Sequence, residues 1–288
     1  MIPTDGAPEP GRTSSEPGAR PVVVEASLDN LRSADVRFLQ EAARSGPLNV
    51  RVPSDGLVAE RTGAPPLFPA MERLFLAESL RWVNSAAIVD RPVMAALPEL
   101  AAARAMLVVR DGDGLAAARL AAAAHGVGFR SVTLADCAGF PDIDPGPALA
   151  AAVPRVVVTG CYDWLHSGHI RFFMDAAAYG ALHVVVGSDL NVAFLKGPGH
   201  PLQHEEERRY MVGSVRSVHR GMISSGSGWM DAEPEIAEIR PAFYVVNEDG
   251  DQPEKRDFCI AHGIEYVVLR RVPHAGLQAR SSTALRGF

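Results

Sequence analysis

Two histidines, His166 and His169, stand one helical turn apart in the part of this chain that is most suited to chemistry. Residues 156–168 read VVVTGCYDWLHSG, and residues 170–180 read IRFFMDAAAYG. The β-branched run, the glycine-containing turn and the helix formers that end on a glycine predict a strand, a loop and a helix. The N-terminus of such a helix can bind phosphate, and imidazoles there can stabilise the charge that builds up in phosphoryl transfer. The alternative for either histidine alone is a satisfied surface or core side chain.

Further landmarks follow in the chain, namely Lys196-Gly197-Pro198, then Glu206-Glu207-Arg208, and near the end Arg280-Ser281-Ser282-Thr283. Together with GCYDWLHSGH, they make residues 155–288 resemble the cytidylyltransferase-like nucleotidyltransferase family. The resemblance implies a Rossmann-like α/β fold and the joining of a nucleoside triphosphate to a phosphorylated alcohol or sugar. Class I aminoacyl-tRNA synthetases also carry a HIGH-type motif, but this sequence has no KMSKS-like loop.

The resemblance also implies roles for individual residues. The predicted catalytic residues are His166, His169 and Lys196, which would stabilise the transition state at the α-phosphorus without a covalent enzyme intermediate. Asp163 is the predicted substrate-binding residue, with a structural hydrogen bond as an equal alternative. The predicted nucleotide-binding residues are Gly160, Cys161, Tyr162, Arg216, Asn247, Arg280, Ser282 and Thr283.

The expected cofactor is Mg²⁺, held mainly through phosphate oxygens and water, so no protein residue is assigned as a metal ligand. The acidic residues of the segment 247–251 are the alternative ligands. Lys196 lies in LKGPGHP, whose glycines and prolines predict a loop that could cover the phosphates, and a solvated surface lysine is the alternative. Hydroxyls near Ser282 can bind phosphate oxygens, or they can simply cap a helix.

Two features differ from the family pattern. Asn247 replaces the glycine of a Gly-Asp-Asp type turn that approaches the nucleotide in the family, and RRVPHAGLQA intervenes between Leu269 and Arg280. Such a longer loop would shape a different acceptor pocket.

An internal repeat joins the two halves of the chain. Residues 22–46, VVVEASLDNLRSADVRFLQEAARSG, align without a gap on residues 156–180, so we expect two copies of one fold. The first copy has Arg32 and Asp35 in place of the two histidines, and Thr62 stands opposite Lys196. We therefore predict that the first copy is catalytically inactive. The tandem arrangement is similar to that of ethanolamine-phosphate cytidylyltransferases.

The predicted organisation has four parts: a disordered tail at residues 1–20, an inactive domain at 21–137, a linker at 138–154 and an active domain at 155–288. We expect two Rossmann-like domains with parallel sheets, related by a pseudo-twofold axis as in homodimers of the family. Apolar runs predict strands at residues 22–26, 48–52, 86–89, 106–109, 156–160, 182–187, 221–224, 243–246 and 265–269.

The composition excludes several classes of protein. A net charge of −6 without a basic block argues against nucleic-acid binding. The three cysteines are too few and too widely spaced for a disulfide framework or a zinc site. No apolar run is long enough to span a membrane and no signal pattern opens the chain, so we expect a cytoplasmic protein. A homodimer of the whole chain stays open.

The leading interpretation is a cytidylyltransferase, with CTP and a phosphorylated small alcohol or a phosphonate giving a CDP-linked product and pyrophosphate. The acceptor phosphate would attack the α-phosphorus directly and in line, and because it is already anionic it needs no general base. One alternative is adenylyl transfer from ATP to a sugar phosphate. Another is a non-catalytic regulatory protein that binds nucleotides.

Overall fold

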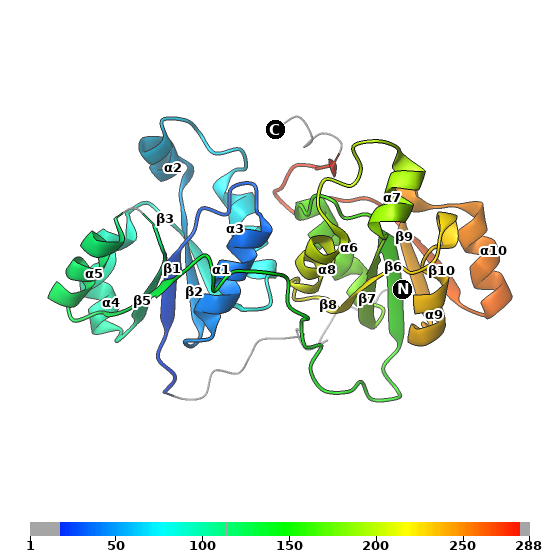
Figure 1. Ribbon diagram of the computed structural model, residues 1–288, viewed down its shortest axis with the longest axis horizontal. Coiled ribbons are helices and arrows are strands. Elements are labelled where there is room, and N and C mark those ends of the chain that lie inside the picture. Colours follow the sequence, from blue (N-terminus) through cyan, green and yellow to red (C-terminus); the bar gives the residue numbers. More distant parts are fainter. Residues whose placement is uncertain (1–17, 113, 283–288) are drawn as a thin grey trace.

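The computed structural model describes residues 18–112 and 114–282, which form two parallel five-stranded sheets flanked by helices (Figure 1). The predicted α/β class with parallel Rossmann-like sheets is therefore confirmed. The first sheet has the order β3-β2-β1-β4-β5, with β1 Val22–Glu25, β2 Leu48–Pro53, β3 Val83–Val89, β4 Met106–Arg110 and β5 Gly128–Val132. The second has the order β10-β9-β6-β7-β8, with β6 Arg155–Gly160, β7 Ala181–Val186, β8 Val218–Ile223, β9 Phe243–Asn247 and β10 Glu265–Leu269.

Helices connect the strands in both halves, as right-handed crossovers between parallel strands require. The first half has α1 Ser33–Ala43, α2 Asp55–Thr62, α3 Ala70–Ser79, the 3₁₀ turn η1 Val93–Ala96, α4 Leu97–Ala102 and α5 Leu115–Ala124. The second half has α6 Ser167–Ala177, α7 Asp189–Lys196, α8 Glu205–Gly213, η2 Gly228–Met230, α9 Glu233–Ile239, η3 Glu248–Gly250 and α10 Pro253–His262.

The order of the strands marks one crevice in each sheet. Strand β6 pairs with β7 on one side, from Val156 opposite Leu182 to Gly160 opposite Val186, and with β9 on the other. The chain therefore leaves the centre of the sheet in opposite directions from β6 and β9. Open parallel sheets bind ligands at the carboxyl ends of their strands at such a switch point, which here is the end of β6 at Gly160.

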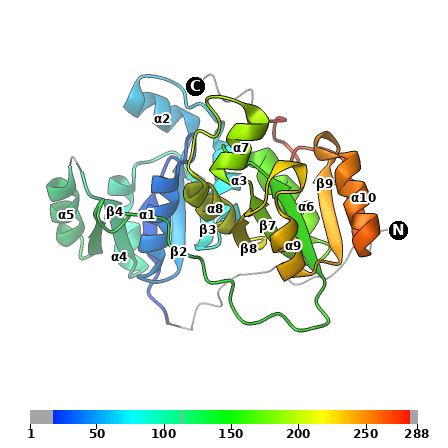
Figure 2. The same ribbon diagram turned by 45° about the vertical axis from the view of Figure 1, so that its right-hand side comes forward.

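Helices α1, α3, α6 and α8 lie between the two sheets (Figures 1 and 2). Helix α3 contacts α6 across the middle of the molecule, and α1 contacts α8. The fully buried side chains of Leu39, Ile170 and Phe173 belong to one hydrophobic cluster that includes residues of both halves. The two halves consequently share one hydrophobic core. Each half also has a smaller core of its own on the outer side of its sheet.

Polar contacts between the halves come in reciprocal pairs. The Arg81 guanidinium donates to the carbonyl of Val215 at 3.4 Å, and the Arg216 guanidinium donates to the carbonyl of Leu80 at 3.1 Å. Leu80 and Val215 themselves form an isolated antiparallel bridge. In each half, therefore, a backbone carbonyl at the equivalent position accepts a hydrogen bond from an arginine of the other half.

The predicted strands correspond to nine observed ones, and β5 is the strand that the sequence did not reveal. Its residues read GFRSV, and only Val132 is fully buried, because β5 is an edge strand paired with β4 alone. A short edge strand needs neither a continuous apolar run nor a clean alternation, so it leaves little pattern to detect.

The segments outside the sheets are more firmly attached than composition predicts. Residues 1–17 of the predicted tail lie outside the described residues, but the side chain of Arg20 donates to the carbonyls of Arg104 and Ala105. Residues 138–154 contain no helix or strand, as expected, yet Phe140 and Ile143 pack against the shared core. The proposed domain boundaries stay predictions. Within the described ranges, none of the helices has the length and apolar character that crossing a membrane requires.

Candidate active site

His166 occupies the N-cap of α6, directly beyond the turn that follows β6. Its backbone is extended, and its ring Nδ1 accepts a hydrogen bond from the backbone N–H of Gly168 at 3.1 Å. Because Nδ1 accepts, the proton of the neutral imidazole is on Nε2. The residue is 2% exposed, and Nε2 has no hydrogen-bond partner among the described residues. A buried donor is therefore left free at the start of a helix.

His169 lies against His166, with ring centroids 3.9 Å apart and the rings stacked. The edge of the Tyr162 ring packs on it from a centroid distance of 5.3 Å, and Nδ1 of His169 is buried without a partner in the described part of the chain. Burial, followed by the positive charges of Arg271 and Arg280, lowers the pKa of His166 to about 3. Burial and then the neighbouring His166 lower the pKa of His169 well below its usual value. Both imidazoles are therefore neutral at pH 7.

Lys196 is the last residue of α7, so the expectation that it lies in a loop is corrected. The helix continues to Lys196 because Ser188 caps its start by accepting from the N–H of Asn191, and Gly197 then ends it with a φ of 82°. The side chain is exposed. Its charge contributes to lowering the pKa of His169, which brings the third predicted catalytic residue within electrostatic reach of the histidines.

The turn between β6 and α6 supports the histidines. Tyr162 has a φ of 51° and is 6% exposed, and a Cβ on Gly160 would meet its ring at 2.8 Å. Only glycine therefore fits at position 160. Burial raises the pKa of the Cys161 thiol, which argues against a nucleophilic role for this cysteine. A role of these three residues in nucleotide binding stays a prediction.

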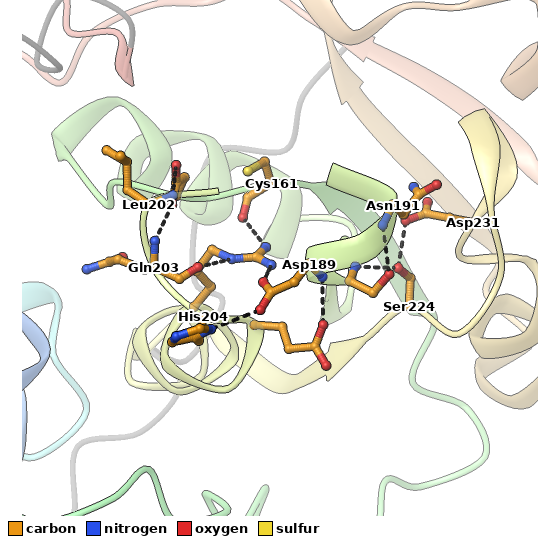
Figure 3. A network of polar contacts seen from close by, with 12 residues as sticks. Cys161, Asp189, Asn191, Leu202, Gln203, His204, Ser224 and Asp231 are labelled. Carbon is orange, nitrogen blue, oxygen red and sulfur yellow. Dashed lines mark hydrogen bonds and ion pairs between the residues drawn. The ribbon is translucent and has the colours of Figure 1, made fainter. Parts of the chain in front are cut away.

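A fully buried arginine of α8, Arg208, connects this turn to α7. Figure 3 shows its partners Cys161, Gln203 and Asp189 close together. Arg208 donates to the carbonyls of Cys161 at 2.8 Å and Gln203 at 3.0 Å, and it pairs with Asp189 at 2.7 Å. The carboxylate of Asp163 accepts from the backbone N–H of Gln203 at 2.8 Å. Asp163 thus has the structural bonds that were the alternative to substrate binding, and its predicted role in binding stays untested.

The first half contains the same set of contacts around a buried arginine and an aspartate. Arg73 is fully buried, donates to the carbonyls of Ser27 and Phe68, and pairs with Asp55 at 2.7 Å. The carboxylate of Asp29 accepts from the N–H of Phe68 at 2.8 Å. These contacts are therefore common to both halves, which indicates a role in the fold.

The segment after β10 brings basic residues to the start of α6. A pocket there is lined by Gly168, Phe172, Asn247, Arg270, Arg271 and Arg280 among others. Two of the predicted nucleotide-binding residues, Asn247 and Arg280, therefore meet beside the histidines. Ser282 follows and is partly buried, whereas Thr283 lies outside the described residues.

Arg271 is a site residue that sequence reasoning missed. Its side chain pairs with Asp249 at 2.9 Å and donates to the carbonyl of Arg280, and its charge lowers the pKa of both His166 and His169. The available signal was a pair of consecutive arginines directly after a strand that ends at the same sheet edge.

Arg216 contacts the other half of the chain. Its guanidinium donates to the carbonyl of Leu80 in the other half, so its predicted role in nucleotide binding stays a prediction that these contacts do not favour.

The acidic residues after β9 do not offer a magnesium site built by the protein. Asp249 is paired with Arg271, and Asp251 is paired with Arg256. The described residues contain no group of three or more histidine, cysteine, aspartate or glutamate side chains that could hold a metal ion. The alternative of protein ligands from this segment therefore does not fit, and we derive no step through a protein-bound metal.

Comparison with known proteins adds to this geometry. The profile of the cytidylyltransferase-like family matches residues 157–271. A FAD synthase from Aciduliprofundum boonei is 34% identical over 119 residues, which are 40% of this chain and 76% of the relative. The chain belongs to the cytidylyltransferase-like family. Membership confirms the family resemblance and supports a nucleotidyltransferase activity.

Two further proteins are similar to a part of the chain. The bifunctional protein HldE of Azotobacter vinelandii is 34% identical over 133 residues, covering 44% of this chain but only 26% of that protein. The lipopolysaccharide core biosynthesis protein of Thermoplasma volcanium aligns with a TM-score of 0.36 and 23% identity, over 43% of this chain and 99% of that one. The family match falls in the second half, so the tandem arrangement and the inactivity of the first half stay predictions.

Proposed function

We propose that this chain transfers a nucleotidyl group from a nucleoside triphosphate to the phosphate of a small acceptor and releases pyrophosphate. The observation that carries the proposal is the buried Nε2–H of His166 at the N-terminus of α6, which has no acceptor among the described residues. Burying a donor without a partner is costly, and a phosphate oxygen of a bound nucleotide would satisfy it.

The reaction is a direct displacement at the α-phosphorus. A phosphate oxygen of the acceptor forms the new bond while the bond from the α-phosphorus to the bridging oxygen breaks, and the electron pair leaves with pyrophosphate. The neutral imidazole of His166 acts through its Nε2–H as a hydrogen-bond donor to an oxygen that gains charge, and the stacked ring of His169 holds it in place. Lys196 and Arg271 supply positive charge close to the same point. Mg²⁺ enters this proposal as a companion of the triphosphate.

The identity of the nucleotide is the open part of the proposal. The FAD synthase relative makes, by its name, a product in which an adenylyl group is joined to a flavin phosphate, and this relationship favours ATP. The motif resemblance favours CTP with a phosphorylated alcohol or a phosphonate as acceptor. We place adenylyl transfer first and keep cytidylyl transfer as the second candidate.

We propose further that the first half is an inactive duplicate, related to the second by a pseudo-twofold axis. The shared strand order and the reciprocal arginine contacts support this. At the first half's equivalent of the site, Arg110 pairs with Asp35 at 3.0 Å. Arg32, which replaces His166, lies 4.2 Å over the ring of Trp164 in the other half. Arg32 and Asp35 thus make structural contacts at the positions of the two histidines.

Thermal unfolding of the full chain with Mg²⁺ and each of ATP, CTP, GTP and UTP tests the donor. A ligand at about 100 times its Kd stabilises the native state by about 2.7 kcal/mol. Stabilisation by ATP alone supports adenylyl transfer, and stabilisation by CTP alone supports the second candidate. Pyrophosphate release with sugar phosphates and phosphoalcohols then tests catalysis. A His166→Asn variant that binds nucleotide but no longer releases pyrophosphate would support the mechanism, and unchanged turnover would refute it.

A further inference from the structure

A carboxylate from the first half reaches the candidate active site of the second. Glu72 lies on α3 and is only 2% exposed. Its Oε1 accepts a hydrogen bond from the hydroxyl of Ser167 at 2.6 Å, and its Oε2 pairs with Arg280 at 2.8 Å. Ser167 is the first residue of α6 and stands between the two histidines of the motif. One buried group therefore joins the start of the catalytic helix to the closing segment of the chain.

Other residues of the segment that follows β10 also pack against the first half. The ring of His274 stacks on Phe75 of α3 with a centroid distance of 4.2 Å, and the Arg280 guanidinium lies 4.9 Å from the centre of the Phe68 ring. Figure 1 shows the chain beyond β10 crossing toward the first half. The loop between Leu269 and Arg280, which is longer than in the family pattern, thus packs against α3 and the residues that precede it.

The matching carboxylate of the second half makes only part of these contacts. Glu207 of α8 accepts from the hydroxyl of Ser33 at 2.6 Å, at the first residue of α1, and from the side-chain amide of Gln203 at 3.2 Å. Among the described residues, Glu207 has no ion pair that corresponds to the one between Glu72 and Arg280. The two glutamates therefore hold equivalent helix starts, but only Glu72 holds a helix start that carries histidines.

We propose that Glu72 is a positioning residue for nucleotidyl transfer, and that the first half completes the active site of the second. The inference rests on the function proposed above. A buried carboxylate is held firmly by its partners because leaving either charge unpaired is costly. Through Ser167 it fixes the first turn of α6, and through the two-point contact with Arg280 it fixes the basic segment that closes the pocket. Substrate does not have to touch Glu72 for this role.

The test compares Glu72→Gln with Glu207→Gln in the full chain. Each change keeps the size of the side chain and removes one charge at the interface. Glu72 is buried and ion-paired whereas Glu207 is only partly buried, so Glu72→Gln should lose more thermal stability, and both variants are assayed at a temperature where they are fully folded. We expect kcat/KM for pyrophosphate release to fall about tenfold or more in Glu72→Gln, as when a charge-assisted hydrogen bond in a site is lost. In Glu207→Gln we expect a change of less than about twofold.

A double-mutant cycle separates positioning from general stability. If Glu72 acts through Arg280, Glu72→Gln should have little further effect on kcat/KM in an Arg280→Gln background. Equal losses in the two single variants would overturn the proposal, and additive losses in the cycle would overturn the part of it that acts through Arg280. Unchanged kcat/KM in Glu72→Gln would overturn it too.

A second readout does not depend on the proposed function. Hydrogen exchange of the backbone amides in the first turn of α6 should be faster in Glu72→Gln and unchanged in Glu207→Gln, which should instead affect α1. If the wild-type protein released no pyrophosphate with any nucleotide, the proposed function would fail, while this exchange measurement would still decide whether Glu72 holds the helix start.

Discussion

Gly168 offers a way to move a candidate catalytic side chain while leaving the fold intact. It is the second residue of α6, and its N–H donates to Nδ1 of His166. A Cβ built on it would lie 2.9 Å from Cε1 and 3.0 Å from Nδ1 of the His166 ring, and 3.3 Å from the carbonyl oxygen of Arg280. The substitution Gly168→Ala must therefore displace the ring, the closing segment or both.

The size of the effect follows from these distances. Carbon atoms pack at about 3.5–4.0 Å, so the ring has to move by about 0.5 Å. A misplacement of about 1 Å can cost about 100-fold in rate, and half of that displacement suggests about tenfold in kcat. Alanine is also favoured over glycine inside a helix by up to about 1 kcal/mol, which offsets the strain. We expect an active-site defect with little change in unfolding temperature.

The assay is steady-state pyrophosphate release together with thermal unfolding. Gly56→Ala is the matched control, because Gly56 is also the second residue of a helix, α2, and a Cβ there would meet no atom within 4 Å. The control should keep wild-type kcat and KM. If Gly168→Ala also kept them, the position of the His166 ring would not matter for turnover, and the proposed mechanism would be refuted.

Three further predictions concern charge at the site. The native pKa of His166 is about 3 against 6.5 in an unfolded chain, so the unfolded state takes up the proton first, and stability should fall as the pH drops through this window. Urea unfolding across that range should show a shallower loss in His166→Asn. Lys196→Ala should lower kcat/KM roughly 10- to 100-fold without loss of stability, since its side chain is exposed, and Lys196→Arg should restore part of the rate. Arg271→Ala should raise the pKa of His166 in an NMR titration by removing a positive charge, whereas Arg256→Ala, which breaks a pair with Asp251, should not.

The sequence predicts the frame of the site because its local patterns are strong. The run from Val156 to Val158 is fully buried in β6, and the helix signal beyond the motif corresponds to α6. Glycine at position 160 and the histidine pair fall at the end of β6, where parallel sheets bind ligands. Such features depend on neighbours within a few residues, so one sequence is enough to detect them.

The remaining site residues depend on contacts between distant segments. Glu72 meets Arg280 only because α3 and the chain beyond β10 come together across the two halves, and no spacing rule links them. Arg271 affects the histidines through its charge, because β10 ends at the same edge of the sheet as β6. The glycines and prolines after Lys196 dominate the local composition and predict a loop, whereas in the structure α7 extends to Lys196.

Comparison of the two halves indicates which features stabilise the fold and which lower its stability. Both halves bury an arginine, Arg73 or Arg208, with a full set of partners, because an unpaired buried charge would be prohibitive. At the helix start the halves differ. The first has the satisfied ion pair of Asp35 and Arg110, whereas the second leaves one buried nitrogen of His166 without a partner in the described residues. An unsatisfied buried polar group costs about 1–3 kcal/mol, so the fold alone gives no reason to keep it. An anionic ligand that accepts from that nitrogen does give one, and it would bind where the first half has an ion pair instead.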